Sequence, residues 1–332
     1  MRVVLVGAGA LGARCARQLH AAPSLSSLAL VDIDAARAKA VAGSLGDRMS
    51  TAGSLDAALG HGGADVVVLS CPGSHEVLAR RALDAGASVV SVTDDPDCAA
   101  ALLALDGDAA ASGSSVVVGA GFAPGLSCLL ARHAAADLTA VEEVHVAKIG
   151  TAGPACARQH HAALAAPTRE WRDGAWVERR SGSGRELCWF PDPIGGVDCY
   201  RAALADPLLL QAAFPDALRV TARMAATRRD RVTAHLPMLR PPHKEGLIGA
   251  VRVEVRGWRD AVSDTRVFGA LDRPAVAGGC VAAVAAAWAA DGRFRRRGAG
   301  GLADLVDDPV PFLSELAGRG VRAAVFEGAG TT

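Results

Sequence analysis

Glycines near the start of the chain have the spacing of a phosphate-binding loop. Gly7-Ala8-Gly9-Ala10-Leu11-Gly12 fits G-x-G-x-x-G, and Asp32 stands twenty residues after Gly12. In such a loop the first glycine permits a tight turn, the second lets the backbone approach a pyrophosphate, and the third lets the helix pack close to its strand. A helix that begins here offers free N–H groups to phosphates. The pattern therefore predicts a dinucleotide site.

The acidic residue of this pattern favours NAD as the cofactor. The Asp32 carboxylate would accept hydrogen bonds from the adenosine ribose, and its charge would repel a 2′-phosphate. Arg37 could accommodate that phosphate, so NADP stays open. The alternative is a glycine turn in an α/β domain that binds no nucleotide. The cofactor-binding residues that we predict in this part of the chain are Gly7, Gly9, Ala10, Leu11, Gly12, Asp32 and Ile33.

Two later loops extend the predicted cofactor site. Ser70-Cys71-Pro72 follows one apolar run, and Thr93-Asp94 follows the next. Ligands of open α/β sheets bind at the carboxyl ends of the strands, where these loops lie. The alternative is that both loops are ordinary turns in which Ser74 and Asp95 only cap helices.

Candidate acid–base groups lie between residues 148 and 192. A hydride transfer needs positioning and a proton donor or acceptor, which points to histidine or to a lysine with a perturbed pKa. Cys156 and His160 share a helix face at i and i+4, and Arg158 could hold a carboxylate. The alternative is solvated surface charge and a turn-forming aspartate. The predicted catalytic residues are His160, His161, Asp192 and Lys148, with Arg158 at the substrate.

The cysteines allow one further interpretation, a metal site. Cys156, His160, Cys188 and Cys199 have the softness that zinc prefers, but their spacing follows no known ligand pattern. We therefore expect no metal. The eight cysteines have no regular framework, so reduced thiols in a cytoplasmic protein are expected.

Apolar runs and helical patterns alternate over the first 120 residues. The runs are residues 2–6, 28–32, 65–70, 88–92 and 115–122, with helices expected at 10–22, 34–45, 75–85 and 97–111. This alternation predicts an α/β fold with a doubly wound parallel sheet, a Rossmann domain. Alternating strands at 141–150, 250–258 and 262–270 and a hairpin at 171–176 then indicate an α+β domain. Helices at 274–290 and 309–318 and a strand at 321–326 end the chain.

Three segments resemble the saccharopine dehydrogenase-like family, which includes lysine 6-dehydrogenase and carboxynorspermidine dehydrogenase. GAGFAPGLSCLLARHAA (119–135) is similar to the loop and helix that end the family's Rossmann domain. CWFPDPIGGVDCYR (188–201) looks like its Pro-Glu-Pro-Ile-Gly segment, and FLSELAGRGVRAAVFEG (312–328) is similar to its last helix and strand. The sequence departs from the family at GPACARQHH (153–161), which leaves the substrate open.

The resemblance implies three parts and one reaction class. Residues 1–124 would form the dinucleotide domain, residues 125–272 a substrate domain that can mediate dimerisation, and residues 273–332 a segment that folds back on the first domain. The expected activity is NAD-dependent hydride transfer on a C–N bond of an amino-acid-derived molecule, by a homodimer. By match, Phe122 and Pro124 would lie near the nicotinamide, and Gly125 near the substrate.

Two other functions remain open. A sugar or polyol dehydrogenase of the glucose–fructose or inositol type shares this layout, but it usually carries Glu-Lys-Pro where this chain has Thr93-Asp94-Asp95-Pro96. A dinucleotide-binding sensor that has lost its chemistry is the non-enzyme alternative. The chain has 35 basic and 35 acidic residues, so no nucleic-acid partner is expected. No targeting segment and no membrane association are expected either.

Overall fold

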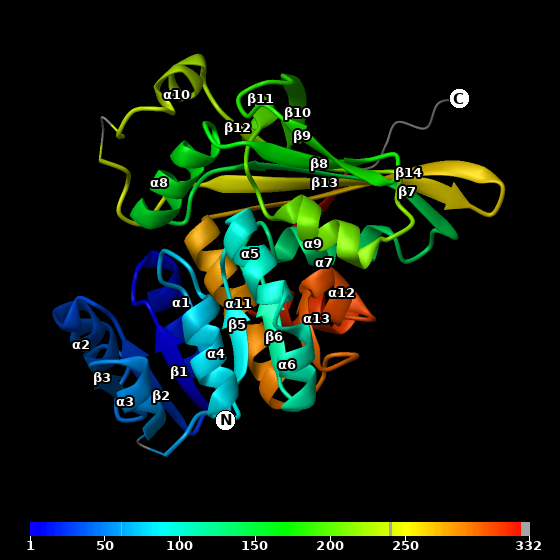
Figure 1. Cartoon of the computed structure of the whole chain (residues 1–332). Coiled ribbons are helices and arrows are strands. Elements are labelled where there is room, and N and C mark those ends of the chain that lie inside the picture. Colours follow the sequence, from blue (N-terminus) through cyan, green and yellow to red (C-terminus); the bar gives the residue numbers. More distant parts are fainter. Residues whose placement is uncertain (61, 239–240, 327–332) are drawn as a thin grey trace.

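The computed structural model describes residues 1–60, 62–238 and 241–326, and shows two domains, each built on one β-sheet (Figure 1). In Figure 1 the first domain lies below and the second above. The last two residues of the third family-like segment, 327 and 328, lie outside the described residues.

A seven-stranded parallel sheet forms the centre of the first domain, in the order β15-β6-β5-β4-β1-β2-β3. The order reverses at β1, which confirms the predicted doubly wound Rossmann sheet. Its strands are β1 (Arg2–Val6), β2 (Ser27–Val31), β3 (Met49–Ala52), β4 (Val66–Leu69), β5 (Ser88–Ser91), β6 (Ser115–Val118) and β15 (Gly298–Gly301).

Helices connect these strands and cover both faces of the sheet. They are α1 (Ala10–His20), α2 (Ala35–Gly43), α3 (Leu55–Gly60), α4 (Glu76–Asp84), α5 (Pro96–Leu103) and α6 (Asp106–Ala111). The single helix expected at 97–111 is two helices, α5 and α6, which are separated at Ala104 and Leu105. That expectation was wrong because helical periodicity continues across this short break.

A second, mixed sheet forms the upper domain, in the order β10-β11-β12-β7-β13-β14-β16, with β8 and β9 joined to β12. Val251, Val253 and Val255 are buried on one face of β13, as their alternation predicts. The strands are β7 (Ala140–Ile149), β8 (Thr168–Arg172), β9 (Ala175–Arg179), β10 (Glu186–Phe190), β11 (Gly195–Arg201), β12 (Arg219–Ala225), β13 (Gly249–Arg259), β14 (Val262–Asp272) and β16 (Ala323–Phe326).

The helices of this domain lie on its lower side or at one end. In Figure 1, α7 and α9 lie between the second sheet and the first domain, while α8 and α10 lie at the left. Their bounds are α7 (Leu126–Ala134), α8 (Pro154–Ala163), α9 (Asp206–Ala213) and α10 (Arg228–Thr233).

The C-terminal segment returns to the first domain and then leaves it. Helix α11 (Pro274–Ala290) packs against α1, β4 and β5, and β15 extends the parallel sheet beside β6. Helices α12 (Leu302–Leu305) and α13 (Pro309–Gly318) follow. The final strand β16 pairs with β14 in the second sheet, so the segment expected to pack on the first domain ends in the other one.

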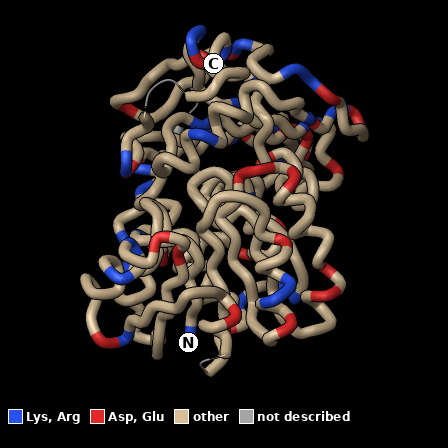
Figure 2. Tube along the Cα trace, turned by 60° about the vertical axis from the view of Figure 1, so that its left-hand side comes forward, with Lys and Arg blue, Asp and Glu red and all other residues tan. Residues whose placement is uncertain are grey.

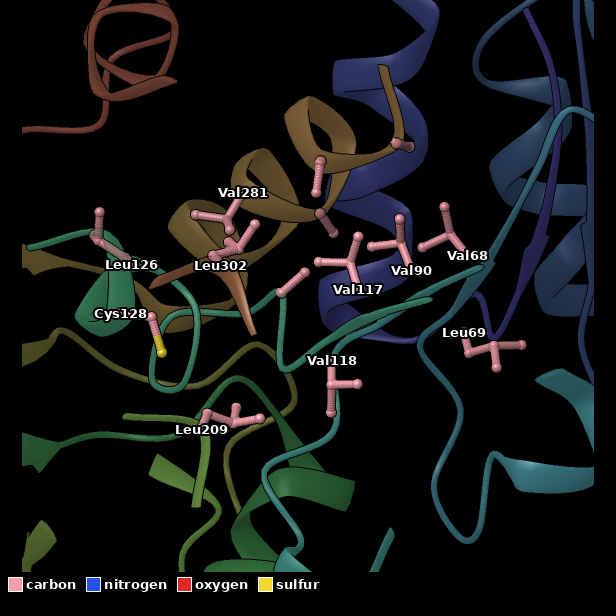
Figure 3. Close-up of a cluster of buried hydrophobic side chains, with 14 of the residues drawn as sticks. Val68, Leu69, Val90, Val117, Val118, Leu126, Cys128, Leu209, Val281 and Leu302 are labelled. Atoms are coloured by element: carbon pink, nitrogen blue, oxygen red, sulfur yellow. The ribbon is translucent and has the colours of Figure 1, made fainter. Parts of the chain in front are cut away.

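The core of the first domain explains why its strands are uninterrupted valine and leucine runs. Val68, Val90 and Val117 lie in a row on neighbouring strands, close to Val281 of α11 (Figure 3). All four side chains are fully buried, and each burial contributes about 1.5–3 kcal/mol relative to exposure. A parallel sheet covered on both faces requires such runs.

Acidic and basic residues occur on both domains (Figure 2). This distribution agrees with the formal net charge of zero. Among the described helices, none combines the length and the apolar content that crossing a membrane requires.

Candidate functional site

The glycine loop after β1 has the shape that a dinucleotide requires. Gly7 has φ +101°, and a Cβ there would lie 2.7 Å from the Cys71 nitrogen. A Cβ on Gly12 would overlap the Gly7 carbonyl oxygen, so only glycine lets α1 come this close to the strand. Gly9, in contrast, faces open space, with no atom within 4 Å of an added Cβ. The loop is therefore closed against the protein and open toward a ligand.

The N-terminus of α1 offers unpaired donors to this open side. Gly9 is the N-cap residue, no side chain caps the helix, and its first turn holds no acidic residue. The free N–H groups and the partial positive charge of the helix end fit a pyrophosphate.

Asp32, at the end of β2, is held in a fixed orientation. Its Oδ2 accepts a hydrogen bond from the Ala8 N–H at 2.6 Å, and its Oδ1 accepts one from the Asp34 N–H at 2.8 Å. The Arg37 guanidinium lies 3.5 Å from Oδ1 and 3.0 Å from the Asp34 carboxylate. Ile33 beside it is fully exposed. This geometry fits the predicted ribose contact, and it places Arg37 at the same rim.

A histidine that sequence reasoning missed holds the loop after β4. His75 is 1 % exposed, and its ring bonds the Cys71 carbonyl oxygen through Nε2 and the Ser91 hydroxyl through Nδ1, both at 2.8 Å. Ser70 donates to the Gly7 carbonyl at 2.6 Å. The 70–72 loop is thus bound to both the glycine loop and β5. Its sequence signal was only a histidine before a helix, which carries little information.

The 119–125 loop joins the two domains. Gly121 donates to the Pro124 carbonyl at 2.9 Å, and the Ala123–Pro124 peptide is cis. Phe122, Pro124 and Gly125 are all buried. The loop presents the Ala123 carbonyl oxygen to the second domain, where Lys148 donates to it at 3.0 Å.

Three charged side chains from three elements meet beside this loop. Asp94 follows β5, Lys148 lies on β7 and His160 lies on α8. The Asp94 Oδ2 lies 3.2 Å from the Lys148 Nζ and 2.6 Å from the His160 Nε2. Lys148 is 3 % exposed and His160 is 7 % exposed. We call these residues the Asp94 cluster.

The cluster is electrostatically coupled. Burial lowers the pKa of His160, but the Cys156 sulfur and the Asp94 carboxylate outweigh burial and the repulsion of Lys148, and they raise this pKa to about 9. Burial also opposes ionisation of Asp94, yet Lys148 and His160 hold the pKa of Asp94 far below its ordinary value. Burial likewise lowers the pKa of Lys148, and the nearby carboxylates reverse this and raise it. At neutral pH the cluster therefore contains one anion and two cations.

A second buried carboxyl group, also missed by sequence reasoning, lies near this cluster. Asp206 at the start of α9 is 0 % exposed, and its Oδ1 accepts a hydrogen bond from Ser127 at 2.7 Å. Its Oδ2 has no partner among the described residues. Burial raises the pKa of Asp206, while Lys148 opposes the rise. An aspartate before a proline is typical of a helix start, so the sequence offers no indication of a functional role for Asp206.

The other predicted residues lie around or outside this cluster. His161 bonds the Leu236 carbonyl oxygen through Nε2 at 2.9 Å. Asp192 is exposed in the turn between β10 and β11, and no described contact joins it to the cluster. Arg158 lines a cavity of about 570 Å³ between α8 and two loops of the first domain. Pro72, Gly73, Ser74, Asp95, Asp97 and Cys98 form the first-domain side of that cavity.

The structure does not bring together the four residues that the metal interpretation named. All eight cysteines are free thiols, and Cys188 and Cys199 lie in a separate apolar cluster with Phe190. Asp94 instead joins Cys156 and His160, with ligand atoms within 4.8 Å of one another. The Lys148 ammonium lies against the same Asp94 oxygen and would repel a cation there. The donor set therefore fits a proton-handling cluster better than a metal.

The comparisons with known proteins agree with this domain structure. Residues 1–92 match the model of an oxidoreductase family with an NAD-binding Rossmann fold. The sequence matches none of the curated proteins. The chain is similar in structure to saccharopine dehydrogenase (L-Glu forming) from Saccharomyces cerevisiae, with a TM-score of 0.72 at 16% identity, over 98% of this chain and 100% of that one.

Two further solved structures share the fold at lower similarity. GenD2 from gentamicin A biosynthesis, in complex with NAD, has a TM-score of 0.51 at 17% identity, over 99% of this chain and 97% of that one. A myo-inositol dehydrogenase from Corynebacterium glutamicum has a TM-score of 0.50 at 16% identity, over 99% of each chain. These likenesses show the fold alone.

The fold is that of a two-domain Rossmann protein, and its first 92 residues match the NAD-binding domain of an oxidoreductase family. The expected cofactor, NAD, is confirmed by the match of residues 1–92 to the model of an NAD-binding family. The resemblance to saccharopine dehydrogenase-like proteins is confirmed for the fold.

Proposed function

We propose that the protein catalyses NAD-dependent hydride transfer at a C–N bond of a small amino-acid-derived molecule. The observation that carries this proposal is the Asp94 cluster. It combines a residue at the carboxyl end of a Rossmann strand with a lysine and a histidine of the second domain, all within hydrogen-bonding distance. Bound substrate would therefore meet cofactor loops and proton-carrying groups at one place.

The cluster can hold and supply a proton. When bound, the nicotinamide supplies the hydride acceptor or donor. His160, whose pKa is raised to about 9, stays protonated at neutral pH and can donate a proton to a substrate nitrogen. Asp94 orients both cationic groups, since one of its oxygens contacts each of them. Lys148 is in turn fixed by the Ala123 carbonyl oxygen.

The cavity beside α8 suits a small charged substrate. Arg158 could hold a carboxylate with two parallel hydrogen bonds, and Asp95 and Asp97 on the opposite wall favour a positively charged amine. Its volume of about 570 Å³ lies within the range of small-molecule sites. Gly125 would contact the substrate through its backbone, and the Gly121–Gly125 bridge holds that backbone in place.

The direct test follows NADH absorbance at 340 nm with amino acids, polyamines and keto acid–amine pairs. We expect turnover with an amine or an imine, and a loss of at least about 100-fold in kcat for Lys148→Met, because removing an acid–base or orienting group costs about this much. Lys39→Met is the matched control, since Lys39 is exposed on α2. Equal activity of the two variants would contradict a role for Lys148.

A sugar or polyol dehydrogenase is the second candidate, and one observation favours it. Lys148 places its ammonium against Asp94 just after β5, where the chain itself lacks the lysine of a Glu-Lys-Pro segment. A lysine from another element could serve a hydroxyl group instead of an amine. Turnover of polyols but not of amines in the same assay would select this candidate.

We also propose that the protein acts as a homodimer. On the side of the second sheet that faces away from the first domain, the helix α10 lies at the left end (Figure 1). Arg252 and Arg256 form ion pairs with Glu254 on this side, and Leu187 and Trp189 of β10 are exposed. A second copy is the partner that a broad sheet face of this kind accepts.

A further inference from the structure

A second cavity, of about 550 Å³, lies wholly within the upper domain. It is bounded by the C-terminal end of α8, by the loop after β9 and by α10. Its size is that of a small-molecule site. None of its lining residues belongs to the first domain.

The lining of this cavity is basic. Arg180, Arg228, Arg231 and His235 line it, and no acidic residue does. Within the described part of the chain, none of these arginines has a carboxylate within 4.0 Å, whereas arginines such as Arg14, Arg201 and Arg296 are held in ion pairs. Positive charges that line one cavity without an acidic residue favour a bound anion.

Some of the donors are fixed in place before any ligand arrives. The Arg231 guanidinium lies 3.9 Å above the centre of the Tyr200 ring, and its Nη1 donates to the Gly182 carbonyl at 3.1 Å. Its Nε is buried without a partner among the described residues. Ser181 is 8 % exposed, and its hydroxyl is also without a described partner. Fixed, unsatisfied donors beside a cavity are what an anion site requires.

The position of this cavity separates it from the Asp94 cluster. The cavity that holds Arg158 contacts residues 155, 158 and 159 of α8 together with loops of the first domain. The basic cavity contacts residues 164 and 165, beyond the other end of the helix. The two cavities share no lining residue.

We propose that this basic cavity binds a small multivalent oxyanion, either a phosphate group or the carboxylates of a small organic acid. Arg180 and Arg228 supply exposed positive charges, and Arg231 with Ser181 supplies the buried donors. The site is separate from the cofactor loop, which is the other place in this chain that fits a phosphate.

The test is calorimetric titration of the full-length protein at constant ionic strength, with inorganic phosphate in one arm and citrate in the other. Saturating NADH is present throughout, so that the cofactor loop is filled. We expect saturable binding of at least one anion. We expect Arg180→Gln and Arg228→Gln each to weaken it about tenfold, because a charge-assisted hydrogen bond contributes about that factor.

Arg229→Gln is the matched control, since Arg229 is the exposed neighbour of Arg228 on α10 and does not line the cavity. Tighter binding of phosphate than of citrate would indicate a phosphate site, and the reverse order of affinities would indicate a carboxylate site. Absence of saturable binding of both anions at millimolar concentrations would overturn the proposal. So would equal weakening by Arg229→Gln, which would indicate general surface charge.

Discussion

At the scale of single residues, chemistry concentrates where β5, β7 and α8 meet. The sequence predicted Lys148 and His160 as catalytic residues and Asp94 as a cofactor contact, and the structure brings all three together. It could not predict the pairing itself, because Lys148 follows Asp94 by 54 residues. Asp206 and His75 were missed for the same reason, since their partners come from other elements.

The charge state of His160 makes stability depend on pH. The pKa of His160 is raised from 6.5 to about 9 in the folded protein. The folded state therefore holds this proton more tightly than the unfolded state. The resulting stabilisation is complete below about pH 6.5 and is lost as the pH rises through about 9. Denaturant unfolding of the wild type should show a loss on the order of 2–3 kcal/mol between these limits.

The comparison with two variants isolates this effect from other groups that titrate. His160→Gln should flatten the decline over this pH range. His235→Gln, a change at an exposed histidine, should leave it unchanged. An identical pH profile for wild type and His160→Gln would contradict the assignment.

Asp32 should decide the choice between the two dinucleotides. Asp32→Asn keeps one acceptor oxygen, which can serve either the Ala8 or the Asp34 N–H group, and removes the charge that repels a 2′-phosphate. We expect NADPH to bind at least about tenfold more tightly than to the wild type, because the 2′-phosphate no longer meets the Asp32 carboxylate, which lies 3.5 Å from Arg37. Fluorescence titration with NADH and NADPH measures both affinities. Asp34→Asn, which keeps the cap of α2, should change the ratio little.

At the scale of elements, burial explains which strands the sequence predicted. Strands β1, β4, β5 and β6 are continuous apolar runs because both faces of the parallel sheet are covered. The strand β3 and the helix α3 were not predicted. Ser50 and Thr51 of β3 are exposed at the edge of the sheet, so this strand lacks an apolar run. The hairpin at 171–176 was predicted, and Trp171 pairs with Trp176 across it.

The contact between α1 and α11 depends on a glycine. A Cβ on Gly279 would lie 2.8 Å from the Cys15 nitrogen and 3.0 Å from the Leu11 carbonyl oxygen. We expect Gly279→Ala to lower the free energy of unfolding by about 1–3 kcal/mol, because one of the two helices must move. Gly107→Ala in α6, where a Cβ meets nothing within 4 Å, is the control and should be neutral or stabilising. Chemical denaturation compares the two, and equal values would contradict the close contact.

At the scale of the whole molecule, the chain alternates between the two sheets. Strands β1–β6 belong to the first sheet, β7–β14 to the second, β15 to the first and β16 to the second. The sequence predicted the order of the domains and the return of the C-terminal segment. It did not predict that β16 would pair with β14, because strand pairing across domains leaves no local pattern. The substrate likewise could not be predicted, since the cavity is formed by residues of both domains that lie far apart in the sequence.

The proposed dimer gives a measurement at this scale. One chain has a mass of 33.7 kDa, and light scattering coupled to size exclusion should give about twice that value. The mass should not depend on NADH if the contact surface is the outer side of the second sheet, which lies away from the cofactor loop. A monomer mass at micromolar concentration would contradict the proposed dimer.

The late position of β15 has a consequence for synthesis of the chain. The Rossmann sheet has Gly298–Gly301 as its edge strand beside β6, and α11 covers β4 and β5. A ribosome that has released only the first 124 residues has therefore produced a sheet without its last strand and with one apolar face uncovered. The first domain therefore completes its sheet only after the second has been translated, and until then the apolar surface that α11 covers on β4 and β5 is open to aggregation.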